Sequence, residues 1–178
     1  ERVLEQTRFP LLLMNPAGLK MQVAADVRFH RILVPLDGSE FSASILPLVT
    51  DLARLYESEV SLLHVAPTVR GLPDSDVARY FAAQEALPAI EPYRLQLEKA
   101  GVRARSLGWT GDPAPEILRI SERGDTDLVA MTTHGRTGLS RWRYGSVAEK
   151  VLRQVRYPLL IRRTSGFPTG KETVPRVA

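Results

Sequence analysis

The stretch that decides the fold is Met131-Thr-Thr-His-Gly-Arg-Thr-Gly-Leu-Ser-Arg-Trp-Arg-Tyr-Gly-Ser-Val147. Its first residues end an apolar segment, residues 127–133, which is typical of a central strand in a parallel sheet. A glycine-containing loop follows, and a helix is predicted to begin at Gly145-Ser146. Free backbone N–H groups and the positive end of a helix dipole bind anions at such a junction. The stretch therefore predicts a phosphate-binding loop at the carboxyl end of a central strand.

On both sides of this loop, strand-like and helix-like patterns alternate along the chain. The predicted strands are residues 31–35, 60–65, 102–109, 127–133 and 157–161. Strands that alternate with helices indicate a parallel sheet covered by helices on both faces. Such sheets bind ligands beyond the carboxyl ends of their strands, where the strand order reverses. The sequence thus predicts an α/β fold with a five-stranded parallel sheet.

Prolines, glycines and capping residues mark the ends of the predicted helices. Ser39 is a good N-cap for a helix that runs to Tyr56, and Pro47 predicts an irregularity inside it. Prolines 88 and 92 are expected to break a helical region over residues 76–100, which Gly101 ends. A further helix is predicted from the N-cap Asp112 to about residue 122.

Composition excludes several classes of protein. The chain has 178 residues, of which 44% are hydrophobic and 25% charged, as in ordinary globular domains. It has no cysteine, which excludes disulfide scaffolds, thiolate zinc sites and cysteine nucleophiles. No apolar run reaches the length of a membrane span, so we expect a cytoplasmic protein without a membrane partner. The net charge of +4 permits an anionic partner.

The first residues repeat the end of the predicted domain. Residues 1–13 align without a gap with residues 149–161, and eight of the thirteen positions are identical. We therefore interpret residues 1–14 as the last helix end and strand of an upstream duplicated domain. Residues 15–28 would be a linker, residues 29–164 the complete domain and residues 165–178 a flexible tail.

The spacing of the loop glycines resembles the nucleotide-binding signature of the universal stress protein family. Nine residues separate Gly135 from Gly145, and Ser146 follows. The segments Val34-Pro-Leu-Asp-Gly-Ser39, Leu62-Leu-His-Val65 and Tyr157-Pro-Leu-Leu-Ile161 are also similar to that family. The resemblance covers residues 29–163, with Thr132 in place of the signature's first glycine. It implies a Rossmann-like fold of the adenine nucleotide alpha hydrolase type, with strand order 3-2-1-4-5.

The resemblance implies a site for ATP, alone or with Mg²⁺. Asp37 would contact the ribose and the backbone at Val65 would recognise the adenine edge. Gly135 and Gly145, with Ser146 and Val147, would hold the phosphates. The charge of Arg136 makes it a further candidate for phosphate contact; Arg141 and Arg143 are weaker ones. The full set of candidate nucleotide-binding residues is Pro35, Asp37, Val65, Met131, Thr132, Gly135, Arg136, Gly145, Ser146 and Val147.

Three functions remain open at this point. The leading hypothesis is a nucleotide-binding regulatory or sensor protein of the stress response, whose liganded state alters dimer or partner contacts. In the resembled family the edge strand, here residues 157–163, would form a homodimer or pseudo-dimer by antiparallel pairing. Because residues 9–14 repeat that strand, the resemblance implies that they form a strand antiparallel to residues 157–163, within the chain or swapped from a neighbour. The alternatives are an interaction domain without nucleotide, supported by Thr132, and a slow ATP hydrolase. No Gly-x-x-x-x-Gly-Lys-Ser/Thr loop, Gly-x-Ser-x-Gly elbow or nucleic-acid-binding module is present, and structural roles are favoured for His64 and His134.

Overall fold

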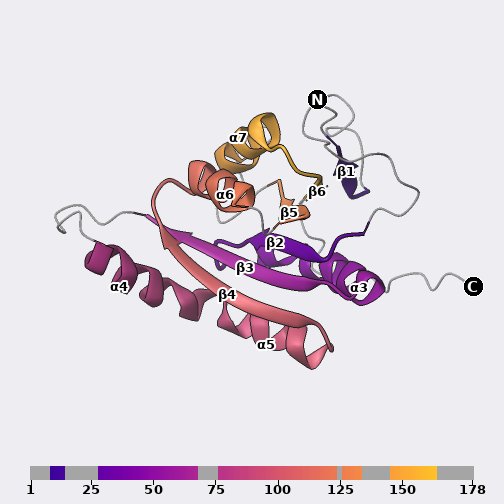
Figure 1. Cartoon of the computed structure of the whole chain (residues 1–178), viewed down its shortest axis with the longest axis horizontal. Helices are drawn as coiled ribbons and strands as arrows, with labels where there is room; N and C mark the ends of the chain where they lie inside the picture. The colour runs from indigo at the N-terminus through magenta and orange to yellow at the C-terminus, as the bar shows by residue number, and fades with distance from the viewer. Residues whose placement is uncertain (1–8, 15–27, 68–75, 124–125, 134–144, 164–178) are drawn as a thin grey trace, which may run out of the picture.

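A single mixed sheet runs through the molecule, with helices packed on both of its faces (Figure 1). The computed structural model describes residues 9–14, 28–67, 76–123, 126–133 and 145–163. The order of the strands is β1-β6-β5-β2-β3-β4. Five of them pair in parallel: β2 (Arg31–Pro35), β3 (Glu59–Ala66), β4 (Arg103–Thr110), β5 (Leu128–Thr132) and β6 (Leu159–Arg162). These are the five strands predicted from the sequence, with ends shifted by at most two residues.

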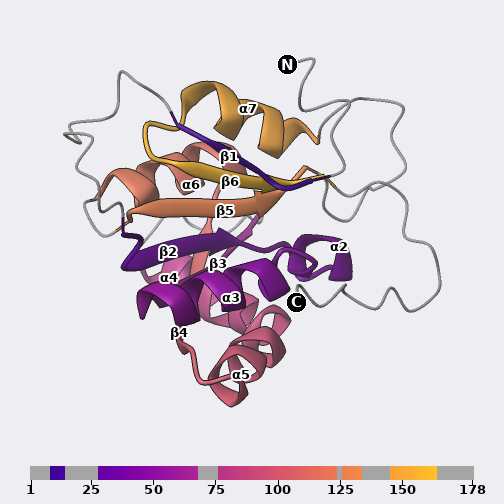
Figure 2. The same ribbon diagram turned by 90° about the vertical axis from the view of Figure 1, so that its right-hand side faces the viewer.

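The sixth strand corrects the prediction of a five-stranded parallel sheet. Strand β1 (Leu11–Leu13) pairs antiparallel with β6 within the same chain (Figure 2). The edge of β6 would otherwise expose unpaired backbone groups, and β1 satisfies them. The predicted pairing of residues 9–14 with residues 157–163 is therefore confirmed, although the ladder covers only three residues on each side. The linker predicted at residues 15–28 and the predicted tail lie almost entirely outside the described residues.

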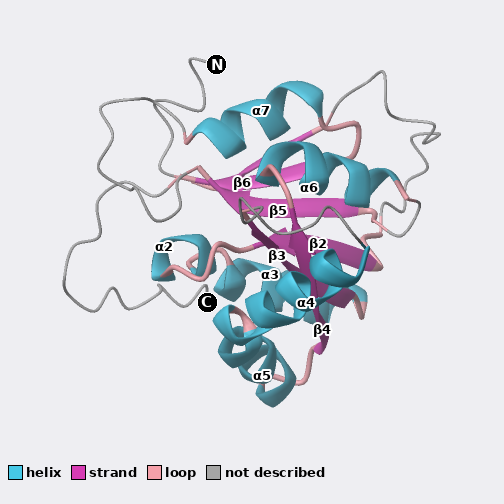
Figure 3. Ribbon diagram, turned by 90° about the vertical axis from the view of Figure 1, so that its left-hand side faces the viewer, coloured by secondary structure: helices cyan, strands magenta, loops and turns pink. Residues whose placement is uncertain are grey.

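Two layers of helices enclose the sheet (Figure 3). One face carries α2 (Glu40–Ala43), α3 (Leu46–Tyr56), α4 (Asp76–Ala86), the 3-10 turn η1 (Leu87–Ala89) and α5 (Glu91–Lys99). The other face carries α6 (Pro113–Glu122) and α7 (Ser146–Gln154). Side chains alternate between the two: Ile32 and Val34 of β2 pack with α3, whereas Leu33 between them packs with α6 and α7. Strands buried on both faces explain why the sequence shows continuous apolar runs.

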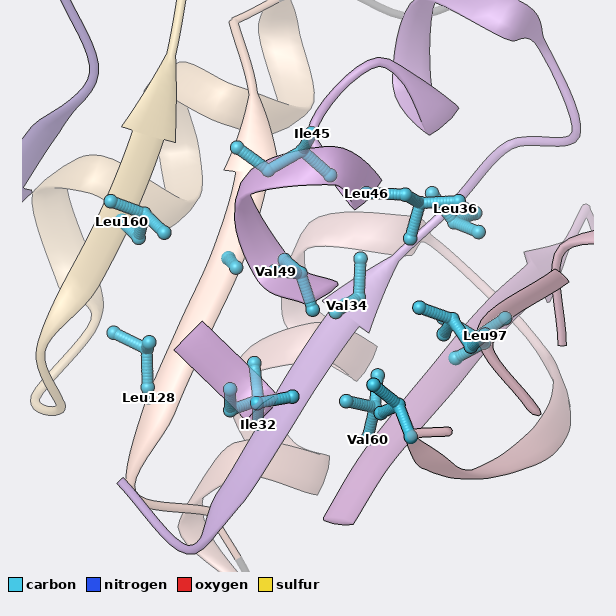
Figure 4. Close-up of a cluster of buried hydrophobic side chains, with 14 of the residues drawn as sticks. Ile32, Val34, Leu36, Ile45, Leu46, Val49, Val60, Leu97, Leu128 and Leu160 are labelled. Carbon is cyan, nitrogen blue, oxygen red and sulfur yellow. The ribbon is translucent and has the colours of Figure 1, made fainter. Parts of the chain in front are cut away.

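The core on the α3 face holds the largest buried cluster of side chains (Figure 4). Ile32 and Leu128 from neighbouring strands contact the same cluster as Ile45 and Val49 from the helical side. Each of these four side chains is at most 1% exposed. At about 1.5–3 kcal/mol for each large apolar side chain fully buried, such clusters supply the main favourable term in folding. They fix the sheet as a rigid support for the loops at its ends.

The predicted helix breaks are confirmed. Ser39 caps α2 by accepting a hydrogen bond from the Ser42 backbone N–H at 3.2 Å. The helix stops before Ile45, and α3 begins with Pro47 in its first turn, where a missing N–H costs nothing. Prolines 88 and 92 divide residues 76–99 into α4, η1 and α5. Among the described residues, none of the helices combines the length and the apolar character needed to cross a membrane.

Candidate functional site

A pocket of about 220 Å³ opens at the carboxyl ends of β2, β3 and β5. Strand β2 lies between β3 and β5, and the chain passes from β2 to β3 on one side and returns to β5 on the other. This is the point where the strand order reverses, the usual place for a ligand in an open α/β sheet. Residues of α6 and α7 close the pocket on one side, and the loop after β2 closes it on the other.

The structure brings together every predicted site residue that it describes. The lining of the pocket includes Pro35, Asp37, Val65, Met131, Thr132, Gly145, Ser146 and Val147. The other two predicted residues, Gly135 and Arg136, lie outside the described residues, as do Arg141, Arg143 and His134. Segments that are more than a hundred residues apart in the sequence therefore meet at one cavity.

The first turn of α7 forms one wall of the pocket. Gly145 is the N-cap residue, and its backbone N–H donates to the carbonyl oxygen of Thr133 at 2.8 Å. The carbonyl of Gly145 accepts the first helical hydrogen bond, from the N–H of Glu149 at 3.0 Å. As a glycine, the N-cap residue itself has no side chain that could cap the helix. The N–H groups at the start of α7 are thus available to an anion in the pocket, where the helix dipole favours negative charge.

Asp37 is held in a tight turn at the opposite wall. Its Oδ1 accepts hydrogen bonds from the backbone N–H of Ser39 at 3.0 Å and from the Ser39 hydroxyl at 2.6 Å. Its own N–H donates to the Ser42 hydroxyl at 3.3 Å. It is the only charged residue in the described lining of the pocket. Burial raises the pKa of Tyr93, and the charges of Glu40 and Asp37 raise that pKa further, so the field of the Asp37 carboxylate extends to α5.

The backbone of Val65 faces the pocket because β2 ends before β3 does. The β2–β3 ladder ends with Pro35 opposite Leu63, and the N–H of Leu36 donates to the Leu63 carbonyl at 2.8 Å. In a parallel strand, alternate residues direct their N–H and C=O groups to the same side. Val65 therefore directs its N–H and C=O groups toward the side of β3 where β2 has already ended. A donor and an acceptor at this spacing suit the edge of a nucleobase.

The side chain of Thr132 lies on the far side of the sheet from α7. Along β5, Val129 and Met131 pack with α6 and α7, whereas Leu128 and Ala130 pack with α3. This alternation assigns Thr132, which is 5% exposed, to the α3 face. The departure from the family signature at this position does not place a side chain against the first turn of α7.

Several lining residues were not predicted from the sequence. They are Leu36, Ser42, Leu63, Pro113, Ile117, Thr133 and Ala148. The spacing of Pro113 and Ile117 places both on one face of α6, but only the packing of that helix against α7 shows that this face meets the pocket. Ser42 could have been found from its place three residues after the N-cap Ser39. No group of three or more histidine, aspartate and glutamate residues within the described ranges is arranged to hold a metal ion.

Comparison with known protein families identifies the domain. A family model described as the Universal stress protein family matches residues 28–163. The Universal stress protein MJ0531 of Methanocaldococcus jannaschii is 31% identical over 139 residues, which cover 75% of this chain and 81% of that protein.

Solved structures give the same fold. The structure of the hypothetical protein MJ0577 has 29% sequence identity and a TM-score of 0.67, and the similarity covers 79% of this chain and 100% of that one. A universal stress protein in complex with cAMP has 18% identity and a TM-score of 0.60, with 78% and 99% of the two chains covered. At that identity the second likeness concerns the fold alone.

Proposed function

This chain belongs to the universal stress protein family, and on that premise we propose that its pocket binds an adenine nucleotide, with ATP as the first candidate. The bound state would act as a regulatory signal by altering dimer or partner contacts. The observation that carries the proposal is the start of α7 at the N-cap glycine Gly145, which forms a wall of a pocket at the reversal of the strand order.

The geometry supports a role for each wall of the pocket. The N–H groups of Ser146 and Val147 suit the phosphates, because the glycine at the N-cap has no side chain to compete for the helix N-terminus. The Asp37 carboxylate suits a ribose hydroxyl, since a carboxylate accepts several hydrogen bonds and Ser39 orients this one through Oδ1. The peptide groups of Val65 suit the adenine edge. The apolar side chains of Leu63, Ile117 and Met131 offer the kind of surface that a base ring buries.

A binding role is favoured over a catalytic one by the chemistry of the described lining. Asp37 is the only residue there with a carboxylate that could act as a general base, and its Oδ1 holds the turn at Ser39. The alternative of an interaction domain without nucleotide rests on Thr132, and the alternation along β5 weakens that argument by placing its side chain on the α3 face.

Substitution of Gly145 by valine tests the proposal. Gly145 has φ −64° and ψ 147°, a conformation that valine also adopts, so the fold should tolerate the change at a cost of about 1 kcal/mol or less. The added side chain would block the approach of a phosphate to the first turn of α7. We expect isothermal titration calorimetry to show ATP binding by the parent chain and at least tenfold weaker binding by Gly145→Val.

Arg153→Val is the matched control, because Arg153 lies on the same helix and its side chain is 62% exposed. It should bind ATP as the parent does. Unchanged ATP affinity in Gly145→Val would remove the phosphate site from α7, and a parent chain that binds no adenine nucleotide would favour the interaction-domain alternative.

A further inference from the structure

Arg162, the last residue of β6, contacts the end of α2 across the carboxyl ends of the strands. Its Nη1 donates to the carbonyl oxygen of Ser44 at 2.6 Å, although 118 residues separate the two in the chain. Ser44 is the C-cap residue of α2, which follows β2 at that end of the sheet (Figure 2). The last carbonyl groups of a helix lack partners within it, and a cation beside them is favourable. The side chain of Arg162 therefore holds the end of α2.

Helix α2 connects Ser44 to the turn at Asp37. The backbone N–H and the hydroxyl of Ser44 both donate to the carbonyl oxygen of Phe41, at 3.3 Å and 2.7 Å. The hydroxyl of Ser42 donates to the Ser39 carbonyl at 2.9 Å and accepts from the N–H of Asp37 at 3.3 Å. Ser42 and Asp37 both line the pocket. Because these bonds join the whole segment, a displacement of Ser44 should also displace this wall of the pocket.

The backbone of Arg162 is connected to the opposite wall. Its carbonyl oxygen accepts a hydrogen bond from the N–H of Thr133 at 2.9 Å. The carbonyl of Thr133 in turn accepts from the N–H of Gly145, the N-cap residue of α7, at 2.8 Å. Thr133 is 1% exposed and lines the pocket. One residue of β6 is therefore hydrogen-bonded toward both walls, through its side chain on one side and its backbone on the other.

Arg162 itself stands outside the pocket. It is not part of the described lining, and within the described residues its guanidinium forms no ion pair. Leu160, two residues earlier on β6, packs with the cluster on the α3 face, so the side chain of Arg162 lies on that face too. Arg162 is thus placed to act on a ligand through the two walls.

We propose that Arg162 is a positioning residue that links the Asp37 turn to the start of α7, and that it thereby sets the affinity of the pocket for a ligand with a ribose. The inference rests on the proposed function for the identity of that ligand. Substitution of Arg162 removes only the side-chain link to α2, because every residue keeps its backbone carbonyl. It should therefore weaken recognition of the ribose by Asp37 and leave recognition of the adenine edge by Val65 unchanged.

Substitution of Arg162 by methionine isolates the contact with Ser44, because Arg162→Met removes the donors and the charge but keeps an apolar stem. Arg103→Met is the matched control. Nη2 of Arg103 also donates to a backbone carbonyl, that of Glu57, at 2.8 Å. Arg103 begins β4, however, so it lies at the end of the sheet away from the pocket. Arg162→Lys keeps a cationic donor and should restore most of what Arg162→Met loses.

Hydrogen–deuterium exchange of the ligand-free protein tests the positioning role. The backbone amides of residues 37–44 should exchange about threefold to tenfold faster in Arg162→Met than in the parent, because local opening of α2 becomes easier. Arg103→Met should leave exchange in this segment unchanged. Residues 145–149 should keep the parent's exchange rates in both variants, since the backbone link from Arg162 to Thr133 remains.

Calorimetry with ATP, adenosine and adenine tests the effect on binding. Arg162→Met should bind ATP and adenosine about threefold to tenfold more weakly than the parent, by the same factor for both. Adenine has no ribose and should bind to the parent and to every variant alike. Adenosine carries no phosphate charge, so a loss confined to ATP would show that Arg162 acts through its positive charge, which would overturn the positioning role.

Two further results would overturn the inference. One is an Arg162→Met variant in which residues 37–44 exchange as in the parent, and the other is a variant that keeps the parent's affinity for adenosine. A parent chain that binds no adenine nucleotide would overturn the proposed function and the effect on affinity. The exchange experiment needs no ligand, so it would still decide whether Arg162 positions α2. Should Arg162→Met fail to fold, Arg162→Gln, whose side chain is shorter than that of arginine, provides the same comparison.

Discussion

The Nδ1 atom of His64 lies 2.8 Å from the carbonyl oxygen of Leu36, and this contact joins β3 to the loop that carries Asp37. A carbonyl oxygen only accepts hydrogen bonds, so Nδ1 carries the proton and donates it. The N–H of Leu36 is bound as well, to the carbonyl of Leu63. Both peptide groups of Leu36 are thus fixed by β3. His64, at 8% exposed, is a positioning residue for one wall of the pocket.

Replacement of His64 should separate this role from simple packing. His64→Leu leaves the Leu36 carbonyl without its partner and should lower the free energy of unfolding by about 1–3 kcal/mol. It should also weaken nucleotide binding several-fold, because the Asp37 turn loses its anchor. His64→Asn carries an amide nitrogen near the position of Nδ1 and should restore most of both quantities. Urea denaturation and calorimetry with ATP measure them.

The exposed His30 supplies the control, since His30→Asn should change neither quantity. A His64→Leu variant with reduced stability but full ATP affinity would show that the role of His64 is structural only.

Substitution of Thr132 should leave the affinity for the ligand nearly unchanged. Because its side chain lies on the α3 face, Thr132→Gly should change ATP affinity by less than about twofold. The same variant should lose about 0.5–1 kcal/mol or more of stability, since glycine weakens a strand interior. Thr132→Val keeps the shape without the hydroxyl, and a clear fall in its affinity by calorimetry would show that the hydroxyl contacts the ligand after all. A rise in affinity for Thr132→Gly would show that the side chain intrudes on the pocket.

Gly108 of β4 sets how closely α4 packs against the sheet. A Cβ atom built at this position would lie 1.9 Å from the backbone carbonyl oxygen of Ala83, so the helix would have to move. Gly108→Ala should therefore lower the free energy of unfolding by about 2–3 kcal/mol, as overpacking does. Gly101→Ala is the comparison: its φ is +78° but no atom lies within 4 Å of the added Cβ.

The free energy of unfolding of Gly101→Ala should fall by only about 1–2 kcal/mol, the cost of the left-handed conformation for alanine. Equal losses for the two variants in urea denaturation would contradict the close approach of α4 to β4.

Much of the fold could be predicted because its signals are local. Apolar runs such as residues 128–132 identify buried parallel strands, and Pro47, Pro88 and Pro92 break helices wherever they fall. The repeat of residues 1–13, together with the edge pairing of the resembled family, also predicted the partner of β1.

The site could be predicted only in part, because some of its walls depend on packing. The turn at Asp37 and the start of α7 follow from local capping and glycine patterns. By contrast, Pro113 and Ile117 reach the pocket because α6 packs beside α7, which no spacing in the sequence states. The side of the sheet to which Thr132 belongs became clear only from the two core clusters. The hydrogen bond from His64 to the Leu36 carbonyl joins β3 to the loop after β2, so it too could be recognised only in the assembled sheet.

The turn at Asp37 allows the ligand role of its carboxylate to be separated from its conformational role. Ser39→Ala removes the hydroxyl that bonds Asp37 Oδ1 and caps α2, but it leaves the carboxylate in place. It should lower stability by about 1 kcal/mol and leave ATP affinity nearly unchanged. Asp37→Ala removes the turn and the proposed ribose contact together, so it should lower stability by a similar amount. Its ATP affinity should also fall about tenfold to a hundredfold, the value of a hydrogen bond to a charged group. Asp37→Asn keeps an acceptor for Ser39 and should show intermediate affinity with near-normal stability.

Calorimetry with ATP and with adenine alone completes the test, because adenine has no ribose and its binding should not respond to Asp37. Equal affinity losses in Ser39→Ala and Asp37→Ala would assign Asp37 to the turn alone.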